Sequence, residues 1–312
     1  MRDEAERTLQ QLDPERLQAT IDQLNRNAPL ILQQSIALLE SGTYKVPYRG
    51  FTVIKFFGPK AESAVPVLIE MLSQKPLARP SYLMNSASGQ NNVWLAPQAS
   101  VAIGAIGPAA RDAVPALTNL LAGKDYNRVD FCKALGGIGP DAGKAIPALE
   151  ALLNGTNEDD RWGRYSDGRG RVNFGVNETV RFAAATALAE IAPDQASNAV
   201  NFLKKVNFQL VGTPLPELSA HVALWKGGME KNPPVTNLMA ILSKGTAANM
   251  YWELAAIQLL AEIGPEARPA LPLLEEFLKP GEVLRWDAVI AIQRIDPQEA
   301  ARLGLPGLLL AF

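Results

Sequence analysis

The 312-residue chain has very little of the chemistry that disulfides and metal sites need. It contains one cysteine, Cys132, and one histidine, His221. A single cysteine cannot form an internal disulfide, so the fold does not depend on an oxidising compartment. One imidazole and one thiol also exclude any site that needs two or more histidine or cysteine ligands. Phosphate-binding glycine loops are absent as well. We therefore predict no metal and no cofactor.

The chain also lacks an excess of charge of either sign. Its 30 Lys and Arg residues stand against 32 Asp and Glu residues, a formal net charge of −2. Because proteins that bind nucleic acid mainly through phosphates need a basic surface, we predict no nucleic-acid partner. Apolar runs stay far below the about 20 residues of a membrane-spanning helix, and the start, MRDEAERTLQ, is too charged for a secretory signal. These absences predict a cytoplasmic chain with no membrane partner.

Glycine and proline, by contrast, recur in a fixed pattern. Four segments align without gaps, at residues 58–72, 107–121, 139–153 and 264–278. They share the pattern G-P-x-A-x-x-A-[VIL]-P-x-L-x-x-[MLF]-L, and two weaker copies begin at Ala192-Pro193 and Asp296-Pro297. Self-similarity of this kind is typical of proteins built from stacked structural repeats.

Each copy predicts a helix, a turn and a second helix. Before the turn, apolar or small residues recur one, four and eight positions back, which places them on one helix face. The glycine predicts the end of the first helix in a left-handed conformation. The second proline, such as Pro66 or Pro115, suits the first turn of the following helix because its missing N–H is not needed there. Residues between, such as 109–113, are expected to form a short helical turn.

This pattern resembles the HEAT family of helical repeats, in particular the bacterial type related to phycobilin-lyase repeats. The resemblance covers residues 48–310, and VRFAAATALAEIAPD at 180–194 is similar to the family's first helix. It implies an all-α, armadillo-like fold: a right-handed α-α superhelix, or α-solenoid, of about six or seven helix pairs in a single domain over residues 1–312. It also implies that Arg128, Arg181 and Arg285, which align on the turn, join neighbouring repeats.

The ends and the spacing of the repeats depart from a regular array. Residues 1–45 are predicted to form an N-terminal helical cap, with one helix starting at Asp13-Pro14-Glu15 and a second over 29–39. Successive turns at 58, 107, 139, 192, 264 and 296 are 49, 32, 53, 72 and 32 residues apart. A two-helix unit needs only about 32–40 residues. The excess predicts insertions near residues 73–96, 154–178 and 208–232, with a further second helix over 234–242.

The middle insertion has the composition of a binding surface. Arginines, acids, a tryptophan and a tyrosine alternate there, and such residues dominate binding hot spots. The alternative is that each aromatic side chain only anchors its own loop to the repeats. The predicted binding residues are Arg161, Trp162, Arg164, Tyr165, Arg169 and Arg171.

No residue pattern predicts an enzyme. The His-Glu pairs of HEAT-like deoxyhypusine hydroxylases are missing, and Cys132 falls on a predicted buried helix face with no sign of a base nearby. The sequence therefore predicts a non-catalytic protein- or peptide-binding scaffold or adaptor, which uses a concave face made by the second helices together with the inserted loops. An alternative is a phycobilin-lyase-like protein that handles a chromophore or modifies a partner. A repeat array with no dedicated site is a third possibility.

Overall fold

The computed structural model describes residues 14–40, 47–73, 77–78, 92–93, 95–123, 128–155, 176–205, 215–243, 250–279 and 281–305. Over these residues the chain is built of many packed helices, which confirms the predicted all-α class. The one departure within the described ranges is a two-residue antiparallel ladder between β1 (Leu77–Ala78) and β2 (Asn92–Val93). This ladder lies in the first predicted insertion.

The repeats appear as helix pairs, four of which are joined by 3-10 turns. The first helices, which precede a turn, are α3 (Pro47–Phe57), α5 (Ala96–Ile106), α7 (Arg128–Ile138), α9 (Val176–Ile191), α13 (Met250–Ile263) and α15 (Arg285–Ile295). The second helices are α4 (Val65–Ser73), α6 (Val114–Leu121), α8 (Ile146–Asn154), α10 (Ser197–Lys205), α14 (Leu271–Glu275) and α16 (Pro297–Arg302). The 3-10 turns are η1 (Gly58–Ala64), η3 (Gly107–Ala113), η4 (Gly139–Ala145) and η7 (Gly264–Ala270), and η8 (Glu276–Leu278) continues α14. The remaining helices are α2 (Pro14–Glu40), α11 (Leu215–Lys226) and α12 (Val235–Ser243).

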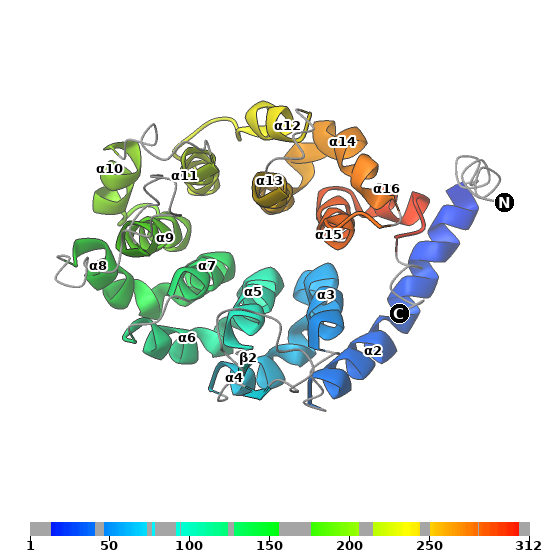
Figure 1. Cartoon of the computed structure of the whole chain (residues 1–312), viewed down its shortest axis with the longest axis horizontal. Helices are drawn as coiled ribbons and strands as arrows, with labels where there is room; N and C mark the ends of the chain where they lie inside the picture. Colours follow the sequence, from blue (N-terminus) through cyan, green and yellow to red (C-terminus); the bar gives the residue numbers. More distant parts are fainter. Residues whose placement is uncertain are drawn as a thin grey trace. The chain divides into compact units, whose positions relative to one another are not determined.

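The packing of the helices divides the chain into two compact units. Unit 1 is Met1–Ser35 with Asn232–Phe312, and unit 2 is Ile36–Lys231. In unit 2 the helices α3, α5, α7, α9 and α11 pack each on the next, while α4, α6 and α8 form a second layer (Figure 1). In unit 1, α13 packs on α12 and α15, and α15 packs on α14 and α16. The single domain over residues 1–312 stays a prediction.

The turn glycines end the first helices as expected, and at Gly107 the backbone conformation differs from the expected one. Gly58, Gly107, Gly139 and Gly264 all have positive φ. At Gly107, φ is 75° and ψ is −142°, which lies outside the left-handed helical region. This combination is accessible almost only to glycine. The second proline of each full repeat is the second residue of the following helix, where no backbone N–H is needed.

The repeated apolar positions form the core. Four residues before each turn lie Ile54, Ile103, Leu135, Leu188, Leu260 and Ile292, and all are buried. The small residues eight positions before the turn, Ala99, Ala184, Ala256 and Ala288, are also buried. Small side chains there let adjacent helices approach each other, and the branched ones fill the space between the two layers.

The structure differs from three predictions made from the sequence, and the first two concern single helices. The N-terminal cap was expected to contain two helices, but α2 runs without a break from Pro14 to Glu40 with Pro29 inside it. A proline inside a helix removes one backbone hydrogen bond. Here the helix continues because it buries residues on both sides of Pro29, namely Ala28, Ile31 and Leu32. The stretch near 208–232 was expected to be a connecting loop, but its residues 215–226 form α11, which packs on α9.

The third correction concerns curvature. In unit 2 the first helices lie on the inner side of the curve and the second helices on the outer side, the reverse of the expected arrangement (Figure 1). Glycines explain the difference. A Cβ added to Gly137 of α7 would lie 2.6 Å from the carbonyl oxygen of Gly104 in α5, so these backbones are in direct contact. The second helices α4, α6 and α8 approach one another less closely. The stack therefore bends toward its first helices.

Candidate binding surfaces

The residues predicted from the middle insertion lie outside the described residues. They are Arg161, Trp162, Arg164, Tyr165, Arg169 and Arg171, all between the end of α8 at Asn154 and the start of α9 at Val176. Their role in binding stays a prediction. The described part of unit 2 offers two further surfaces, an inner face and an outer groove.

The inner face of unit 2 is formed by the free side of its first helices. Because second helices and neighbouring first helices cover the other sides, side chains that keep solvent exposure lie along this face or at helix ends. Val101 of α5, Lys133 of α7 and Thr186 of α9 keep such exposure, and each lies six residues before its turn. We call these three residues the inner-face row. The repeat thus presents one side chain per helix at equivalent positions.

An ion pair joins α9 to α11. Lys226 Nζ lies 2.7 Å from Glu190 Oε1, and the side chains are 27% and 12% exposed. Gly136 of α7 makes room for this pair, since an added Cβ would lie 2.4 Å from Glu190 Oε2. Because the carboxylate is largely shielded from water, removal of Lys226 would leave it poorly solvated and without this cation. The ion pair fixes α11 against the repeat that precedes it.

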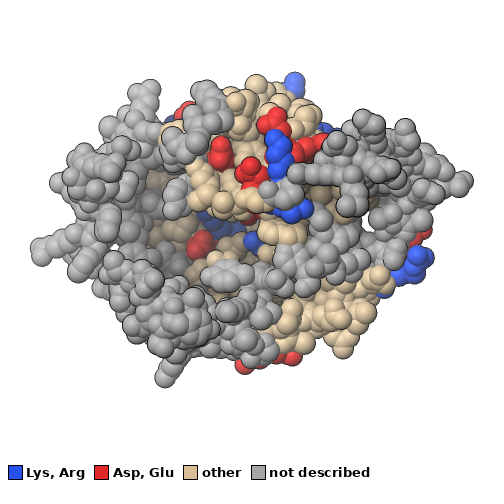
Figure 2. Space-filling view, turned by 45° about the vertical axis from the view of Figure 1, so that its right-hand side comes forward, with Lys and Arg blue, Asp and Glu red and all other residues tan. Residues whose placement is uncertain are grey.

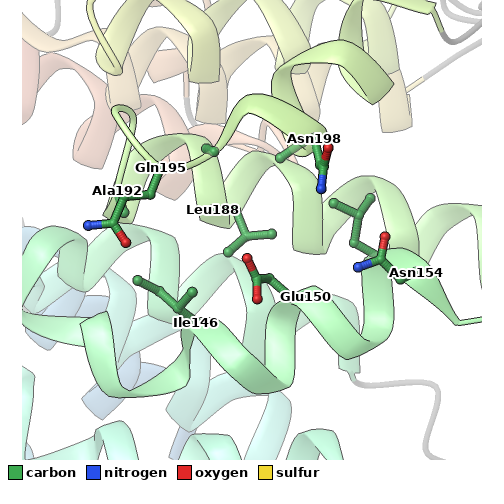
Figure 3. A pocket seen from close by; sticks show the side chains of 10 residues that line it. Ile146, Glu150, Asn154, Leu188, Ala192, Gln195 and Asn198 are labelled. Atoms are coloured by element: carbon green, nitrogen blue, oxygen red, sulfur yellow. The ribbon is translucent and has the colours of Figure 1, made fainter.

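The outer groove lies between α8 and the segment that joins α9 to α10 (Figure 3). It is shallow and partly open to solvent, with room for about one water molecule. Ile146, Leu153 and Leu188 supply its apolar surface, together with the alanines Ala192, Ala196 and Ala199. The polar residues that line it are Glu150, Asn154, Gln195 and Asn198.

A break in the repeat explains the groove. Elsewhere in unit 2 each second helix packs on the next, α4 on α6 and α6 on α8. By contrast, α10 packs on α9 and α11 and is in little direct contact with α8. The turn between α9 and α10 is the weaker copy that starts at Ala192-Pro193 and lacks the glycine. The irregular turn displaces α10, and the space left beside α8 becomes the groove.

Arg181 joins two helix pairs next to this groove. Its Nε donates a hydrogen bond of 2.9 Å to the carbonyl oxygen of Leu153 at the end of α8. Its guanidinium also lies 5.0 Å from the centre of the Phe202 ring in α10. A cation over an aromatic face and a bonded helix-terminal carbonyl are both stabilising. This geometry supports the structural role that the resemblance implies for Arg181.

Cys132 and His221, the one thiol and the one imidazole of the chain, both lie within the described residues. Burial raises the pKa of the Cys132 thiol to about 12, so the thiol stays protonated and unreactive at neutral pH. The imidazole of His221 lies beside a carboxylate, with 2.8 Å between His221 Nδ1 and Glu230 Oε1. This contact joins the middle of α11 to the turn that follows the helix. Within the described residues, no group of three or more His, Cys, Asp or Glu side chains could hold a metal ion.

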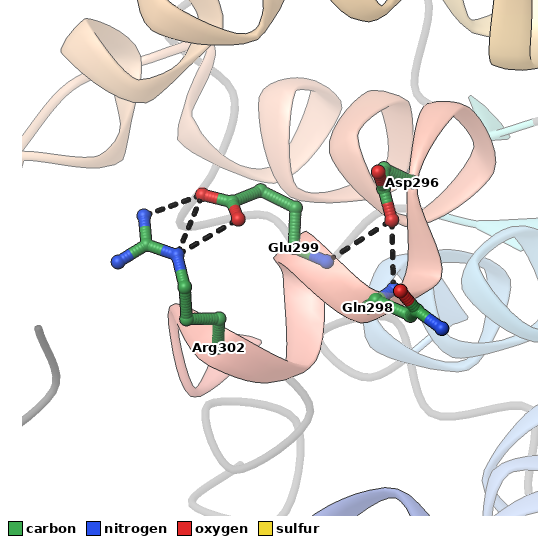
Figure 4. Close-up of polar contacts among 4 residues, drawn as sticks. All are labelled: Asp296, Gln298, Glu299 and Arg302. Atoms are coloured by element: carbon green, nitrogen blue, oxygen red, sulfur yellow. Dashed lines mark hydrogen bonds and ion pairs between the residues drawn. The ribbon is translucent and has the colours of Figure 1, made fainter. Parts of the chain in front are cut away.

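In unit 1 the charged side chains organise the last helix. Asp296 caps α16 by accepting hydrogen bonds from the backbone N–H groups of Gln298 and Glu299, and Arg302 pairs with the Glu299 carboxylate (Figure 4). The pKa of Glu275 is raised by burial and by the like charge of Glu299, while Arg302 acts in the opposite direction. On the face shown in Figure 2, the described acidic and basic side chains lie beside one another and form no stripe of one sign.

No family model matches the chain. No curated protein matches it either. Among solved structures, the chain is similar to an engineered protein whose crystal structure was determined by the Northeast Structural Genomics Consortium. That match has 17% sequence identity and a TM-score of 0.33, and it covers 88% of this chain and 72% of the engineered one. Among the residues that the structure describes, no helix is both long and apolar enough to cross a membrane.

Sequence reasoning missed the groove. Glu150, Asn154, Gln195 and Asn198 carry no motif, and they come from two different repeats. One signal was available in the copy at Ala192-Pro193, where the glycine and the second proline of the pattern are both missing. Such an imperfect copy indicates irregular packing at that point of the stack.

Proposed function

We propose that the chain is a HEAT-like α-solenoid that binds a protein or peptide as a non-catalytic scaffold or adaptor. The packing within each unit supports this proposal, because every helix pair mainly contacts its neighbours in sequence. Nearest-neighbour packing is the architecture of repeat proteins, which commonly use their extended curved surfaces for binding. The right-handed superhelical path and the six or seven pairs belong to the same proposal.

The observation that carries the proposal is the inner-face row. Val101, Lys133 and Thr186 occupy equivalent repeat positions on three consecutive helices and keep solvent exposure. A row of exposed side chains on a rigid, evenly spaced frame can contact regularly spaced residues of one bound chain, about every third residue of an extended segment. The frame needs little reorganisation on binding, which lowers the entropic cost of association. The arginines and aromatic residues of the middle insertion are proposed as a second contact region.

An affinity pull-down from the native source, read by mass spectrometry, tests this proposal. The baits are the intact chain, a variant with residues 159–171 replaced by a Gly/Ser linker, and the inner-face variant Val101→Glu/Lys133→Glu. Lys144→Glu, which changes an exposed side chain of η4 away from the inner-face row, is the matched control.

A protein retained by the intact chain and the control, but lost from either of the other two variants, supports the scaffold function. The variant that loses the protein identifies the contact region. If the intact chain retains no protein, the scaffold proposal fails. A protein retained equally by all four baits would move the contact away from both proposed regions.

A further inference from the structure

We propose that the exposed face of α2 pairs with the same face of a second copy of the chain, as two antiparallel helices related by a two-fold axis. This inference goes beyond the scaffold function and does not rest on it. Five side chains form the face, and we call them the α2 stripe: Arg26, Leu30, Gln33, Ala37 and Glu40. All five are exposed to solvent.

The α2 stripe follows from the spacing of its residues on a single helix. Its members are separated by four, three, four and three positions, which places them along one line of an α-helix. The buried residues of α2 lie on the opposite side of the helix: Ala28, Ile31, Leu32, Ser35 and Leu39. Because α2 runs without a break over these positions, the alignment of the stripe depends on this helix alone.

The middle of the α2 stripe is apolar or uncharged although it faces solvent. Leu30 is 57% exposed. The thirteen residues between Arg26 and Glu40 include no Lys, Arg, Asp or Glu, so they bring no charge to the exposed side of the helix. The exposed side of a helix that meets only water usually carries charged residues. Charged residues are depleted at the centres of protein interfaces, which is the pattern seen here.

The charges at the two ends of the stripe identify a second copy as the partner. Arg26 and Glu40 each lie seven positions from Gln33, on opposite sides of it. In an antiparallel pair centred on Gln33, Arg26 of one copy meets Glu40 of the other, and the two-fold axis repeats this contact. A parallel pair would instead bring like charges together. Neither side chain is joined by a hydrogen bond or an ion pair to another described residue, so both charges are available to the second copy.

The residues between these charges suit the same arrangement. Gln33 meets its own copy at the axis, and a side-chain amide is self-complementary because it both donates and accepts hydrogen bonds. On either side of the axis, the bulky Leu30 of one copy lies beside the small Ala37 of the other, which allows the helices to approach closely. The apolar contact is small compared with that of a permanent dimer, so we expect a dimer that dissociates on dilution.

Sedimentation equilibrium of the full-length chain over a range of concentrations tests this surface. We expect a reversible equilibrium between monomer and dimer. Leu30→Glu should abolish the dimer, because it places two carboxylates in the apolar part of the contact. Val283→Glu is the matched control, since Val283 is an apolar residue outside α2 that is 72% exposed, and it should leave the dimer unchanged. Circular dichroism melting of each variant shows that the fold is kept.

Exchange of the two charges gives a test that a loss of folding cannot imitate. Arg26→Glu and Glu40→Arg should each weaken self-association about tenfold, because each variant brings like charges together at two symmetric contacts. An equimolar mixture of the two variants should form dimers again, since both contacts of the mixed dimer then join opposite charges. The double variant Arg26→Glu/Glu40→Arg should dimerise as the native chain does, for the same reason.

A cysteine substitution locates the axis. Gln33→Cys should form a disulfide between two copies on oxidation in air, whereas Glu62→Cys, on the exposed surface of η1, should not. Cys132 is buried and does not compete. Three outcomes overturn the proposal: a chain that stays monomeric at every concentration, a dimer that Leu30→Glu leaves intact, or charge variants that fail to dimerise when they are mixed.

Discussion

At the scale of single residues, the turn glycines perform the most specific task in the chain. Each must end one helix and redirect the backbone within a single residue, which requires a positive φ. The chain offers an internal control for this requirement. Gly139 and Gly143 both lie in η4, and an added Cβ at either position meets nothing within 4 Å. Gly139 has a φ of 76°, whereas Gly143 is not among the glycines with positive φ.

We therefore predict opposite effects of alanine at these two positions. Gly139→Ala should lower the free energy of unfolding by about 1–2 kcal/mol, because only the backbone conformation is unfavourable. Gly143→Ala should raise it by about 0.4–1 kcal/mol, since alanine restricts the unfolded chain without straining the turn. Urea unfolding followed by circular dichroism measures both. Equal effects of the two substitutions would show that positive φ does not determine the choice of glycine.

Glu275 gives a second prediction at this scale, because burial and the neighbouring Glu299 raise the pKa of its carboxyl group. A raised pKa means that the folded state favours the protonated form. Its stabilising contribution is therefore present at acidic pH, below the ordinary value of 4.5, and is lost as the pH rises through the folded-state pKa. Glu275→Gln should then stabilise the fold by a few tenths of a kcal/mol at pH 7, after allowance for solvent screening.

This gain should disappear near pH 4, where the native carboxyl group is itself protonated. Glu276→Gln is the matched control, because Glu276 is the next residue and is exposed. It should change the free energy of unfolding little at either pH. Thermal melts at pH 7 and pH 4 measure the difference. A gain from Glu275→Gln that is the same at both pH values would contradict the assigned cause.

At the scale of elements, glycines inside the first helices set how closely the repeats stack. Gly137 of α7 faces the backbone of Gly104 in α5, and an added Cβ would lie 2.9 Å from the Gly104 Cα. Backbone atoms cannot yield as a flexible side chain can. Gly137→Ala should therefore push α5 and α7 apart and cost about 1–3 kcal/mol of stability, despite the better helix propensity of alanine.

Lys133→Ala is the control for this prediction, because Lys133 is an exposed residue of the same helix. It should leave stability within about 0.5 kcal/mol of the native chain. Chemical unfolding with both variants gives the comparison. If Gly137→Ala is neutral or stabilising, the close approach of α5 and α7 does not determine the curvature of unit 2.

Local rules account for what could be predicted from the sequence at this scale. The ends of the first helices follow from glycine and proline chemistry, and the core positions follow from a spacing that depends on one helix alone. The continuous α2 was missed because the effect of Pro29 on a helix depends on how much packing surrounds it. The groove and the curvature were missed for a related reason. Both depend on the distance between helices, at α8 with α10 and at Gly137 with Gly104, and no single segment encodes that distance.

At the scale of the whole molecule, the question is whether the repeats unfold together. The helix packing separates unit 1 from unit 2, whereas the repeat pattern predicts one continuous domain. Repeat proteins transmit stability only through neighbouring repeats, so a weak junction lets the two sides unfold independently. Leu149 of α8 in unit 2 and Leu274 of α14 in unit 1 occupy the same repeat position, and both are fully buried. They form a matched pair with which to perturb each unit separately.

We predict that each substitution acts within its own unit. Leu149→Ala and Leu274→Ala should each cost about 2–5 kcal/mol, the usual effect of a cavity in a packed core. In hydrogen exchange, Leu149→Ala should accelerate the amides of α5, α7 and α9 and leave α13 and α15 unchanged, and Leu274→Ala should do the reverse. Hydrogen exchange gives the free energy of opening for each helix separately, so it shows whether the two units open independently. If both variants accelerate all five helices equally, the chain unfolds as one cooperative unit, and the single domain predicted from the repeat is supported instead.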